Sequence, residues 1–506
     1  MNLAEKVGQL LHVGFHGLVA PDYLLEWLTE GRVGGVILFA RNVESPEQVA
    51  ALTASLHAAA KFPLLVSIDQ EGGTVARLRA GFTESPGAMA LAAGGDIQRV
   101  EEMSAVLGAE MCALGINWVY APVLDLLYNV ENPSLMTRSF GKERVGEFAA
   151  AAVRGFQSQG VAACAKHFPG LGDTAIDTHL ALPALTKSVR DLIHDDLPPY
   201  IDTIDAGLAT VMTTHTIYTA LDTELPATLS KVIIHRLLRD ELQFDGVVTT
   251  DCMEMKAISD NFGTGESAVL AALAGVDVIL VSHTRATQEE AYAALLKAAL
   301  SGRLPETSID AALMRIRKLK ARYPAQSPDL SIIRKPEHVA TAQAAARAGI
   351  VVRNGDLPLD LSGNVVLIEF ASVLESEILE NGGLSGLART VAAAHPNIKT
   401  HTLKGWELDS LQVEAALDDV VNADLLILAT RNAHFQAHPL QLAQEIISHA
   451  RRTALVCLRS PFDSVALPGA EVVLCTCGDS TPSLQAALDA LTGVFQPSGK
   501  LPVTLS

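Results

Sequence analysis

The chain has 506 residues, 49% of them hydrophobic, which is enough material for two or three domains. Its net charge of −19 argues against nucleic acid and anionic membrane surfaces as partners, because both bind clustered Lys and Arg side chains. The N-terminal stretch lacks the basic and apolar regions of a signal peptide, no segment reaches about 18 apolar residues, and the six cysteines are scattered, so we expect a cytoplasmic protein with reduced thiols.

Short apolar runs rich in β-branched residues alternate with helical segments over about the first 320 residues. The predicted strands are 10–15, 33–39, 64–69, 117–122, 161–167, 210–215, 246–251 and 276–282. Near-continuous apolar strands that alternate with helices are typical of a parallel sheet covered by helices. A count of eight favours a closed (β/α)₈ TIM-like barrel over an open, doubly wound sheet.

A second α/β pattern begins after a boundary region marked by three prolines, Pro324, Pro328 and Pro336. An Ala-rich helix is predicted over 337–349, and further strands over 365–370, 424–430, 453–460 and 471–477. We therefore predict a barrel over 1–325, a linker and connecting helix over 326–346, and a smaller α/β sandwich domain over 347–506. The second domain has neither a G-x-G-x-x-G after a strand nor a P-loop, so no nucleotide cofactor is expected.

Several barrel strands finish on polar or charged residues: Asp69, Lys166 with His167, His215 and Asp251. The carboxyl ends of barrel strands meet at one face, which is where active sites of such barrels lie. The sequence therefore predicts that these groups converge at one site.

Asp251 ends a β-branched strand, so it is either a nucleophile or base at the barrel mouth or the N-cap of the next helix. Two carboxylates flanking a bond are the usual apparatus of a glycosidase, and the loop 166–183 offers Asp173 and Asp177. In an extended segment Asp177 and His179 share a side, so the carboxylate could orient the imidazole as a general acid/base. The alternative is ordinary surface structure.

A metal site is a further possibility to weigh, because His167, His179, His215 and Asp177 are all ordinary zinc ligands. Their spacing fits no ligand motif such as H-E-x-x-H, and we expect no metal.

Asp69 and Arg77 belong to the segment "SIDQEGGTVARL", which has the carboxylate and guanidinium donors and acceptors that sugar hydroxyls need. An ion pair that holds a loop would explain the same two residues. Arg138 in "TRSFG" could likewise bind a sugar or have no such role, since a lone Arg is usually a solvated surface residue.

A set of motifs then appears in the order and spacing of glycoside hydrolase family 3. The chain resembles this family, and most closely its bacterial two-domain β-N-acetylglucosaminidase (β-hexosaminidase) branch, over most of its length. The motifs that carry the resemblance are "DQEGG" with Arg77, "APVLD" (121–125), "RSFG", "KHFPG.GDT..D.H..LP", "TTDCMEM", "AARAGIVVRNGDLPL" (345–359), "LRSPFD" (458–463) and "GKLPVTL".

The resemblance implies a retaining mechanism in which Asp251 is the nucleophile and the Asp177–His179 pair is the acid/base. It also implies sugar-binding roles for Asp69, Arg77, Arg138, Lys166 and His167, and His215 lies in a similar strand-end motif. The chain departs from the branch at Leu171, where His is usual, at Thr74, where Arg is common, and at Cys252, where a second Asp is usual. The first two of these departures bear on the aglycone.

The leading hypothesis is a hydrolase that releases terminal β-linked N-acetylglucosamine, a small-molecule sugar substrate, with peptidoglycan-derived muropeptides as natural substrates by resemblance. One alternative is a phosphorylase that uses phosphate as acceptor, because a neutral imidazole repels the anion less than a glutamate would. Another is an inactive sugar-binding protein on the same fold. We expect the second domain to be structural or to mediate assembly, because every catalytic candidate precedes residue 260.

Overall fold

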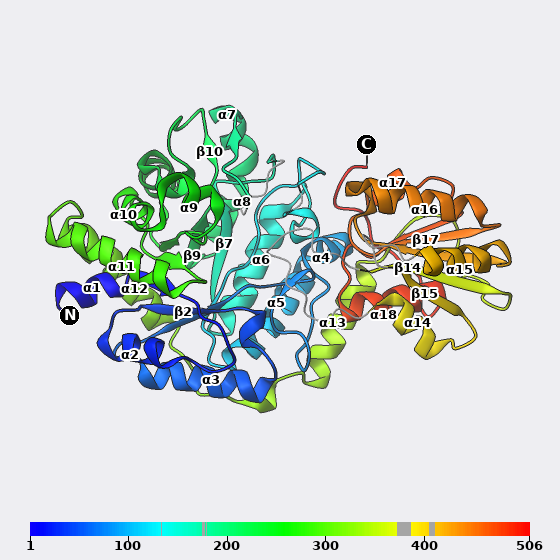
Figure 1. Ribbon diagram of the computed structural model, residues 1–506, viewed down its shortest axis with the longest axis horizontal. Coiled ribbons are helices and arrows are strands. Elements are labelled where there is room, and N and C mark those ends of the chain that lie inside the picture. The colour runs from blue at the N-terminus through cyan, green and yellow to red at the C-terminus, as the bar shows by residue number, and fades with distance from the viewer. Residues whose placement is uncertain (133, 175–177, 179, 372–385, 404–409, 506) are drawn as a thin grey trace.

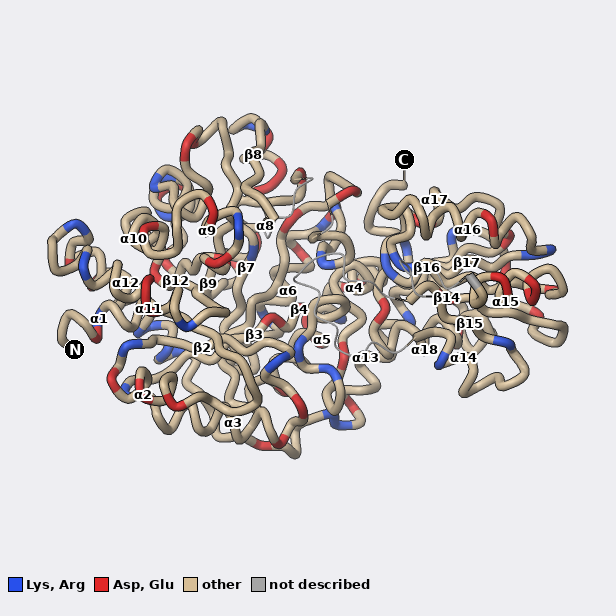
Figure 2. The backbone as a smooth tube through the Cα atoms, viewed as in Figure 1, with Lys and Arg blue, Asp and Glu red and all other residues tan. Residues whose placement is uncertain are grey.

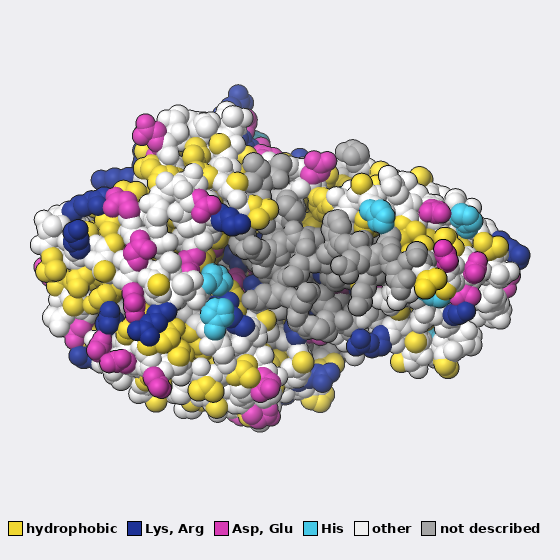
Figure 3. All heavy atoms as spheres, in the orientation of Figure 1, with side chains coloured by type: hydrophobic (Ala, Val, Ile, Leu, Met, Phe, Trp, Pro, Cys, Tyr) yellow, Lys and Arg dark blue, Asp and Glu magenta, His cyan; other side chains and the backbone are white. Residues whose placement is uncertain are grey.

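The computed structural model describes residues 1–132, 134–174, 178, 180–371, 386–403 and 410–505. The chain forms two bodies joined by a helix: the N-terminal part makes the larger one, and the C-terminal part makes the smaller one at the other end of the molecule (Figure 1). Lys and Arg are interspersed with Asp and Glu over both bodies (Figure 2), and charged side chains of both signs are scattered over the coloured part of the face seen in Figure 3.

Parallel strands in the first body close into a barrel. Within the described ranges the barrel strands are β1 (Leu11–Val13), β2 (Gly35–Leu38), β3 (Leu65–Ile68), β6 (Trp118–Val119), β7 (Ala162–Phe168), β9 (Thr210–Thr213), β11 (Val247–Thr249) and β12 (Ile279–Val281). Their order is β11-β9-β7-β6-β3-β2-β1-β12, every neighbouring pair is parallel, and a bridge between Thr249 and Val278 joins the two ends. The predicted TIM-like barrel is confirmed, and each strand lies within or within one residue of a predicted apolar run.

Helices surround the barrel. They are α1 (Leu3–Gly8), α2 (Asp22–Glu30), α3 (Pro46–Ala59), α4 (Ala88–Gly94), α5 (Ile97–Cys112), α6 (Val145–Ser158), α8 (Pro198–Asp205), α9 (Lys256–Phe262), α10 (Thr264–Ala274), α11 (Arg285–Leu300) and α12 (Glu306–Arg322), with a further helix over Val232–Glu241. Two small strand pairs lie outside the barrel: a hairpin of β4 (Gln70–Gly72) and β5 (Val75–Ala76), and β8 (Ala184–Leu185) beside β10 (Ile217–Tyr218).

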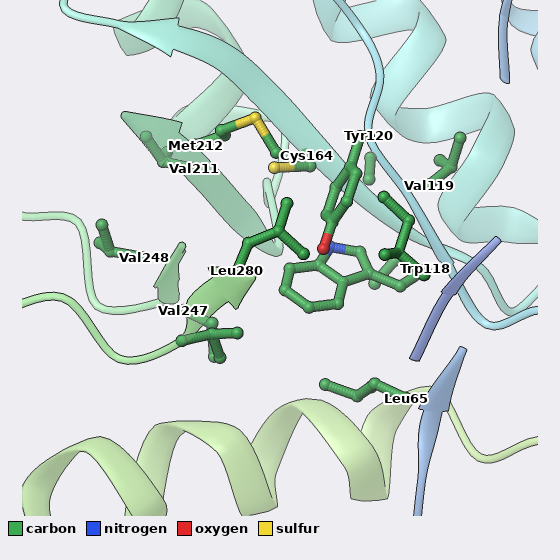
Figure 4. Packing of buried hydrophobic residues seen from close by; sticks show 14 of the residues in the cluster. Leu65, Trp118, Val119, Tyr120, Cys164, Val211, Met212, Val247, Val248 and Leu280 are labelled. Atoms are coloured by element: carbon green, nitrogen blue, oxygen red, sulfur yellow. The ribbon is translucent and has the colours of Figure 1, made fainter. Parts of the chain in front are cut away.

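The barrel interior is filled by side chains from different strands. Trp118, Tyr120 and Leu280 pack toward one another there (Figure 4), and all three are at most 3% exposed. The indole N–H of Trp118 donates to Thr210 Oγ1 at 2.9 Å, so the one polar atom of this large ring is satisfied where water is excluded. Because side chains fill the barrel interior, a ligand-binding site would have to lie at the mouth of the barrel.

The second body is a six-stranded sheet between two layers of helices. Its described strands are β13 (Val351–Asn354), β14 (Val365–Phe370), β15 (Lys399–Leu403), β16 (Leu425–Thr430), β17 (Thr453–Cys457) and β18 (Val472–Cys475), in the order β13-β18-β17-β16-β14-β15. β13 is antiparallel and the others are parallel, so the predicted mostly parallel α/β sandwich is confirmed. Helices α14 (Leu387–Ala394) and α18 (Thr481–Leu491) cover one face, and α15 (Ser410–Val421) and α16 (Ala437–His449) the other.

The connecting helix α13 (Pro336–Ala348) agrees closely with the Ala-rich helix predicted over 337–349. α12 ends at Arg322, and the division of the chain at residues 325 and 346 stays a prediction. One hydrophobic cluster runs across the joint between the two bodies, because Met89 and Leu135 of the first pack with Val351 and Leu428 of the second. The second body is therefore packed against the first.

Candidate active site

Five of the predicted site residues line one cavity at the mouth of the barrel: Asp69, Arg77, Lys166, His167 and Asp251. Asp69 follows β3, Lys166 and His167 lie near the end of β7, and Asp251 follows β11. The cavity has a volume of about 110 Å³. Its described lining is Ile37, Phe39, Asp69, Arg77, Tyr120, Lys166, His167, Met212, Asp251, Cys252, Met255, Leu280, Ser282 and His283.

A chain of ion pairs starts at one wall of this cavity, with Asp69, Arg77 and Lys166, and continues behind it to Glu71 and Arg138. The Nζ atom of Lys166 lies 2.8 Å from Asp69 Oδ1 and 2.6 Å from Glu71 Oε1. On the far side of Glu71, the guanidinium of Arg138 makes two hydrogen bonds of 2.9 Å to the carboxylate. Arg77 is 3.6 Å from Asp69 Oδ2. Carboxylates and cations alternate along this series of ion pairs, so each fixes the position of the next.

Glu71 stays ionised at the centre of this network. Burial raises its pKa, but the charges of Arg138 and Lys166 outweigh burial and lower the pKa to about 2. For Lys166, burial lowers the pKa, and the charges of Asp69 and Glu71 reverse the effect and raise it. Both side chains are therefore charged at neutral pH, and the ammonium of Lys166, which lines the cavity, can donate hydrogen bonds into it.

Asp251 faces the cavity from a turn that is held at several points. Its Oδ1 accepts the backbone N–H of Cys252 at 2.7 Å, and the carbonyl of Cys252 accepts from His215 Nε2 at 2.9 Å. Because a carbonyl only accepts, Nε2 carries the proton, and on the other side of the ring Nδ1 lies 2.8 Å from the Thr228 hydroxyl oxygen. His215 thus acts on Asp251 through the backbone of the next residue.

The thiol of Cys252 lines the same cavity, but burial raises its pKa to about 12. The thiol lies 2.8 Å from the Ser282 hydroxyl. A thiol is a weak nucleophile when it is protonated, so the Asp251 carboxylate is the better candidate nucleophile on this turn.

Asp125 holds the strand end and the loop that follows it. Its Oδ2 lies 2.7 Å from His167 Nδ1, and its Oδ1 accepts the backbone N–H of Leu171 at 2.8 Å. The carboxylate requires the proton of His167 on Nδ1. One buried side chain therefore orients a cavity residue and fixes the start of the 166–183 loop.

The structure places the remaining predicted residues in different ways. Arg77 lines the cavity, whereas Arg138 lies behind the wall with its side chain 3% exposed, and His215 is fully buried beneath the Asp251 turn. Asp177 and His179 lie outside the described residues, and their acid/base role stays a prediction.

Two carboxylates that organise the site carried no assigned role in the sequence analysis. Glu71 is part of "DQEGG" and Asp125 ends "APVLD", and both stretches are among the motifs that carry the family resemblance. The signal for Glu71 was its position two residues after Asp69, which ends a predicted strand. Asp125 follows an apolar strand in the same way as Asp69 and Asp251 do.

Among the residues that the structure describes, no group of three or more His, Cys, Asp or Glu side chains could hold a metal ion. No helix within the described ranges is both long enough and apolar enough to cross a membrane.

Comparison with known proteins identifies the family. Residues 2–319 match the glycosyl hydrolase family 3 N-terminal domain. The chain is 33% identical to "Beta-hexosaminidase A" of Pseudoalteromonas piscicida over 84% of this chain and 74% of that protein, and 29% identical to "Beta-N-acetylglucosaminidase/beta-glucosidase" of Cellulomonas fimi over 99% and 93%. The solved structure of a glycoside hydrolase family 3 β-N-acetylglucosaminidase from Paenibacillus sp. str. FPU-7 superimposes with a TM-score of 0.93 at 36% identity, covering 100% of this chain and 99% of that one. The chain belongs to glycosyl hydrolase family 3 and is a glycoside hydrolase.

Proposed function

We propose that this chain is a retaining β-N-acetylglucosaminidase that hydrolyses terminal β-linked N-acetylglucosamine. The observation that carries the proposal is the placement of Asp251 in the same cavity as Lys166, Asp69 and Arg77. A carboxylate nucleophile opposite a wall of paired charges suits a sugar ring, whose hydroxyls both donate and accept hydrogen bonds. The relatives named above as hexosaminidases and acetylglucosaminidases support the same substrate class.

In the proposed first step, a carboxylate oxygen of Asp251 bonds to the anomeric carbon while the glycosidic C–O bond breaks. The electron pair leaves with the aglycone oxygen, which takes a proton from His179, and Asp177 stabilises the imidazolium that is present before the transfer. In the second step water gives a proton to His179 and displaces Asp251 from the anomeric carbon. Two inversions at this carbon retain the β configuration.

The wall residues would bind and orient the ring during both steps. Lys166 and Asp69 offer a donor and an acceptor that hold each other in place, and His167, with its proton on Nδ1, offers Nε2 as an acceptor. We infer that the natural substrates are peptidoglycan-derived muropeptides; this inference and the cytoplasmic location rest on the sequence.

The decisive measurement is turnover of 4-nitrophenyl N-acetyl-β-glucosaminide by the full chain. We expect Asp251→Ala to lower kcat by at least about a thousandfold, because it removes the nucleophile. Asp260→Ala, an exposed carboxylate on α9, is the control and should retain wild-type turnover. A slow, activated fluorosugar should add its mass to the peptide that contains Asp251. Unchanged turnover by Asp251→Ala would remove the assignment.

The acid/base role of His179 has its own test. His179→Ala should lower turnover of a natural disaccharide far more than that of the nitrophenyl glycoside, whose leaving group needs little protonation. Equal losses on both substrates would contradict the role.

Phosphorolysis is the competing chemistry. Each described cation that lines the cavity has a carboxylate partner: Lys166 pairs with Asp69 and Glu71, and Arg77 with Asp69. This pairing supports hydrolysis, since a phosphate anion gains most from uncompensated positive charge. We expect free N-acetylglucosamine as the product, at a rate independent of added phosphate. Release of the sugar 1-phosphate would establish the phosphorylase instead, and absence of any turnover would favour a sugar-binding protein.

A further inference from the structure

The hairpin that carries Glu71 and Arg77 turns at two glycines. Gly72 and Gly73 have φ angles of +90° and +60°, which favour glycine. A Cβ on Gly73 would lie 2.9 Å from Gly87 Cα, so this turn packs tightly on the loop that follows Ser85. A turn made of glycines is flexible unless contacts with residues outside the turn restrict it.

Arg79 holds the outer side of this turn. Its Nη2 donates to the carbonyls of Gly73 and Thr74, both at 3.0 Å, and its side chain is 7% exposed. Its Nη1 lies 3.2 Å from Glu84 Oε2. The guanidinium therefore joins the turn to Glu84 through its two terminal nitrogens.

Glu84 is in turn bound by the second domain. Its other oxygen, Oε1, accepts from Thr481 Oγ1 at 2.6 Å, and Thr481 is the first residue of α18. A continuous path of hydrogen bonds thus runs from the second domain through Glu84 and Arg79 to the turn between Glu71 and Arg77.

The neighbouring loop of the second domain is shaped for this contact. A Cβ on Gly478 would lie 2.3 Å from the carbonyl oxygen of Pro86, so a side chain there would push the two loops apart. Asp479, fully buried beside it, binds Arg431 and Arg459 at 2.9 Å each. Burial lowers the pKa of Arg79, the charges of Glu84 and Asp479 raise it, and those of Arg77 and Arg459 lower it, so charges of both signs from the second domain act on Arg79.

We propose that the second domain positions the sugar-binding hairpin, with Thr481 as a positioning residue that acts through Glu84 and Arg79. Its effect on catalysis rests on the function proposed above. Fixing the turn restricts the hairpin and so sets where Arg77 and Glu71 stand relative to the sugar. The domain is then part of how the site binds substrate.

Thr481→Val tests the path, since it keeps the shape of the side chain and removes the hydroxyl. We expect KM for the nitrophenyl glycoside to rise about fivefold, which is the loss of one hydrogen bond of roughly 1 kcal/mol, with kcat changed less than twofold. Amide exchange in peptides that cover residues 70–79 should become at least threefold faster. The control is Thr492→Val at the other end of α18, where the hydroxyl donates to the Leu488 carbonyl at 2.8 Å. It should change neither quantity.

A double-mutant cycle separates the path from a general loss of stability. In a Glu84→Ala background, Thr481→Val should lower kcat/KM by much less than it does in the wild type, because the carboxylate that accepts its hydroxyl is already gone. Effects that multiply independently would overturn the proposal, as would an unchanged KM and exchange rate in Thr481→Val or an equal effect from Thr492→Val.

The two proposals can fail separately. If the wild-type chain turns over no N-acetylglucosaminide, the proposed function fails, and amide exchange at residues 70–79 still tests the hold on the hairpin. If turnover is normal and exchange at these residues is the same in Thr481→Val as in the wild type, only the positioning role fails.

Discussion

Replacing Glu71 by Gln should destabilise the protein because it removes the carboxylate that binds buried Arg138 and one of the two carboxylates that bind buried Lys166. The Glu71 side chain is 4% exposed, and Arg138 and Lys166, which it binds, are 3% and 1% exposed. Its pKa falls from the ordinary 4.5 to about 2 because the charges of Arg138 and Lys166 overcome burial. At about 1.4 kcal/mol per pKa unit, this fall corresponds to roughly 3 kcal/mol of stability at neutral pH. Breaking a buried ion pair on one side typically costs about 3–5 kcal/mol, which agrees.

The stability that Glu71 contributes depends on pH. The pKa of Glu71 is lower in the folded chain, so its contribution is complete above about pH 4.5 and is lost as the pH falls toward 2. Urea unfolding followed by tryptophan fluorescence should show Glu71→Gln less stable than the wild type by about 3 kcal/mol at pH 7 and by about 2 kcal/mol at pH 3.5. Trp27 and Trp118 are buried in the barrel and report on it.

A matched control exists on the surface. Glu147 binds Arg144 through two hydrogen bonds of 3.2 and 3.1 Å, the same fork geometry as Glu71 with Arg138, but both side chains are nearly half exposed. Glu147→Gln should cost less than about 0.5 kcal/mol, since exposed pairs contribute little. Equal losses in Glu71→Gln and Glu147→Gln, or a loss for Glu71→Gln that does not shrink below pH 4.5, would refute the reasoning.

Two further predictions concern other buried groups. Asp125→Asn should lower kcat/KM by at least tenfold, with a smaller change in stability. The neutral amide has one acceptor oxygen, so it cannot accept from both His167 Nδ1 and the Leu171 N–H as the two carboxylate oxygens do. Kinetics with the nitrophenyl glycoside and urea unfolding will test the two parts of this prediction. Burial lowers the pKa of Lys320 to about 7, so the unfolded chain binds more protons between pH 7 and about 10.5 and stability rises with pH over that window. Lys320→Met should stabilise the chain at pH 7 and remove this rise, as urea unfolding at pH 7 and pH 10 will show; a rise that persists in the variant would assign it to another group.

The barrel could be predicted from the sequence because its strands are buried on both faces and therefore read as continuous apolar runs. Strands without that burial were missed. β15 has the sequence "KTHTL", lies at the edge of its sheet and has one fully buried residue, and β13 is a partly exposed antiparallel edge strand. The β4–β5 hairpin is too short for a periodic pattern to form.

The sequence predicted those site residues whose location in the fold follows from their position at the end of a strand. Asp69, Lys166 and Asp251 end strands, and parallel strands carry their carboxyl ends to one face. The partners of Glu71 could not be predicted in this way, because Arg138 lies 67 residues away and comes close only through packing of the 134–141 loop. The same holds for His215, whose strand-end position does not reveal that its ring turns inward to the Cys252 carbonyl.

Leu171 and Thr74, two departures from the family pattern, bind their neighbours through backbone atoms. Leu171 donates its N–H to Asp125 at 2.8 Å, and Thr74 accepts Arg79 through its carbonyl at 3.0 Å. Any L-residue can make these contacts, so neither substitution disturbs the loop that it belongs to. The two residues are 5% and 7% exposed and are absent from the described lining of the cavity that contains Asp251. This burial argues that neither side chain touches an aglycone. In the described part of the cavity, an exposed aromatic ring is instead offered by His283, which packs on Phe39 with ring centres 5.2 Å apart.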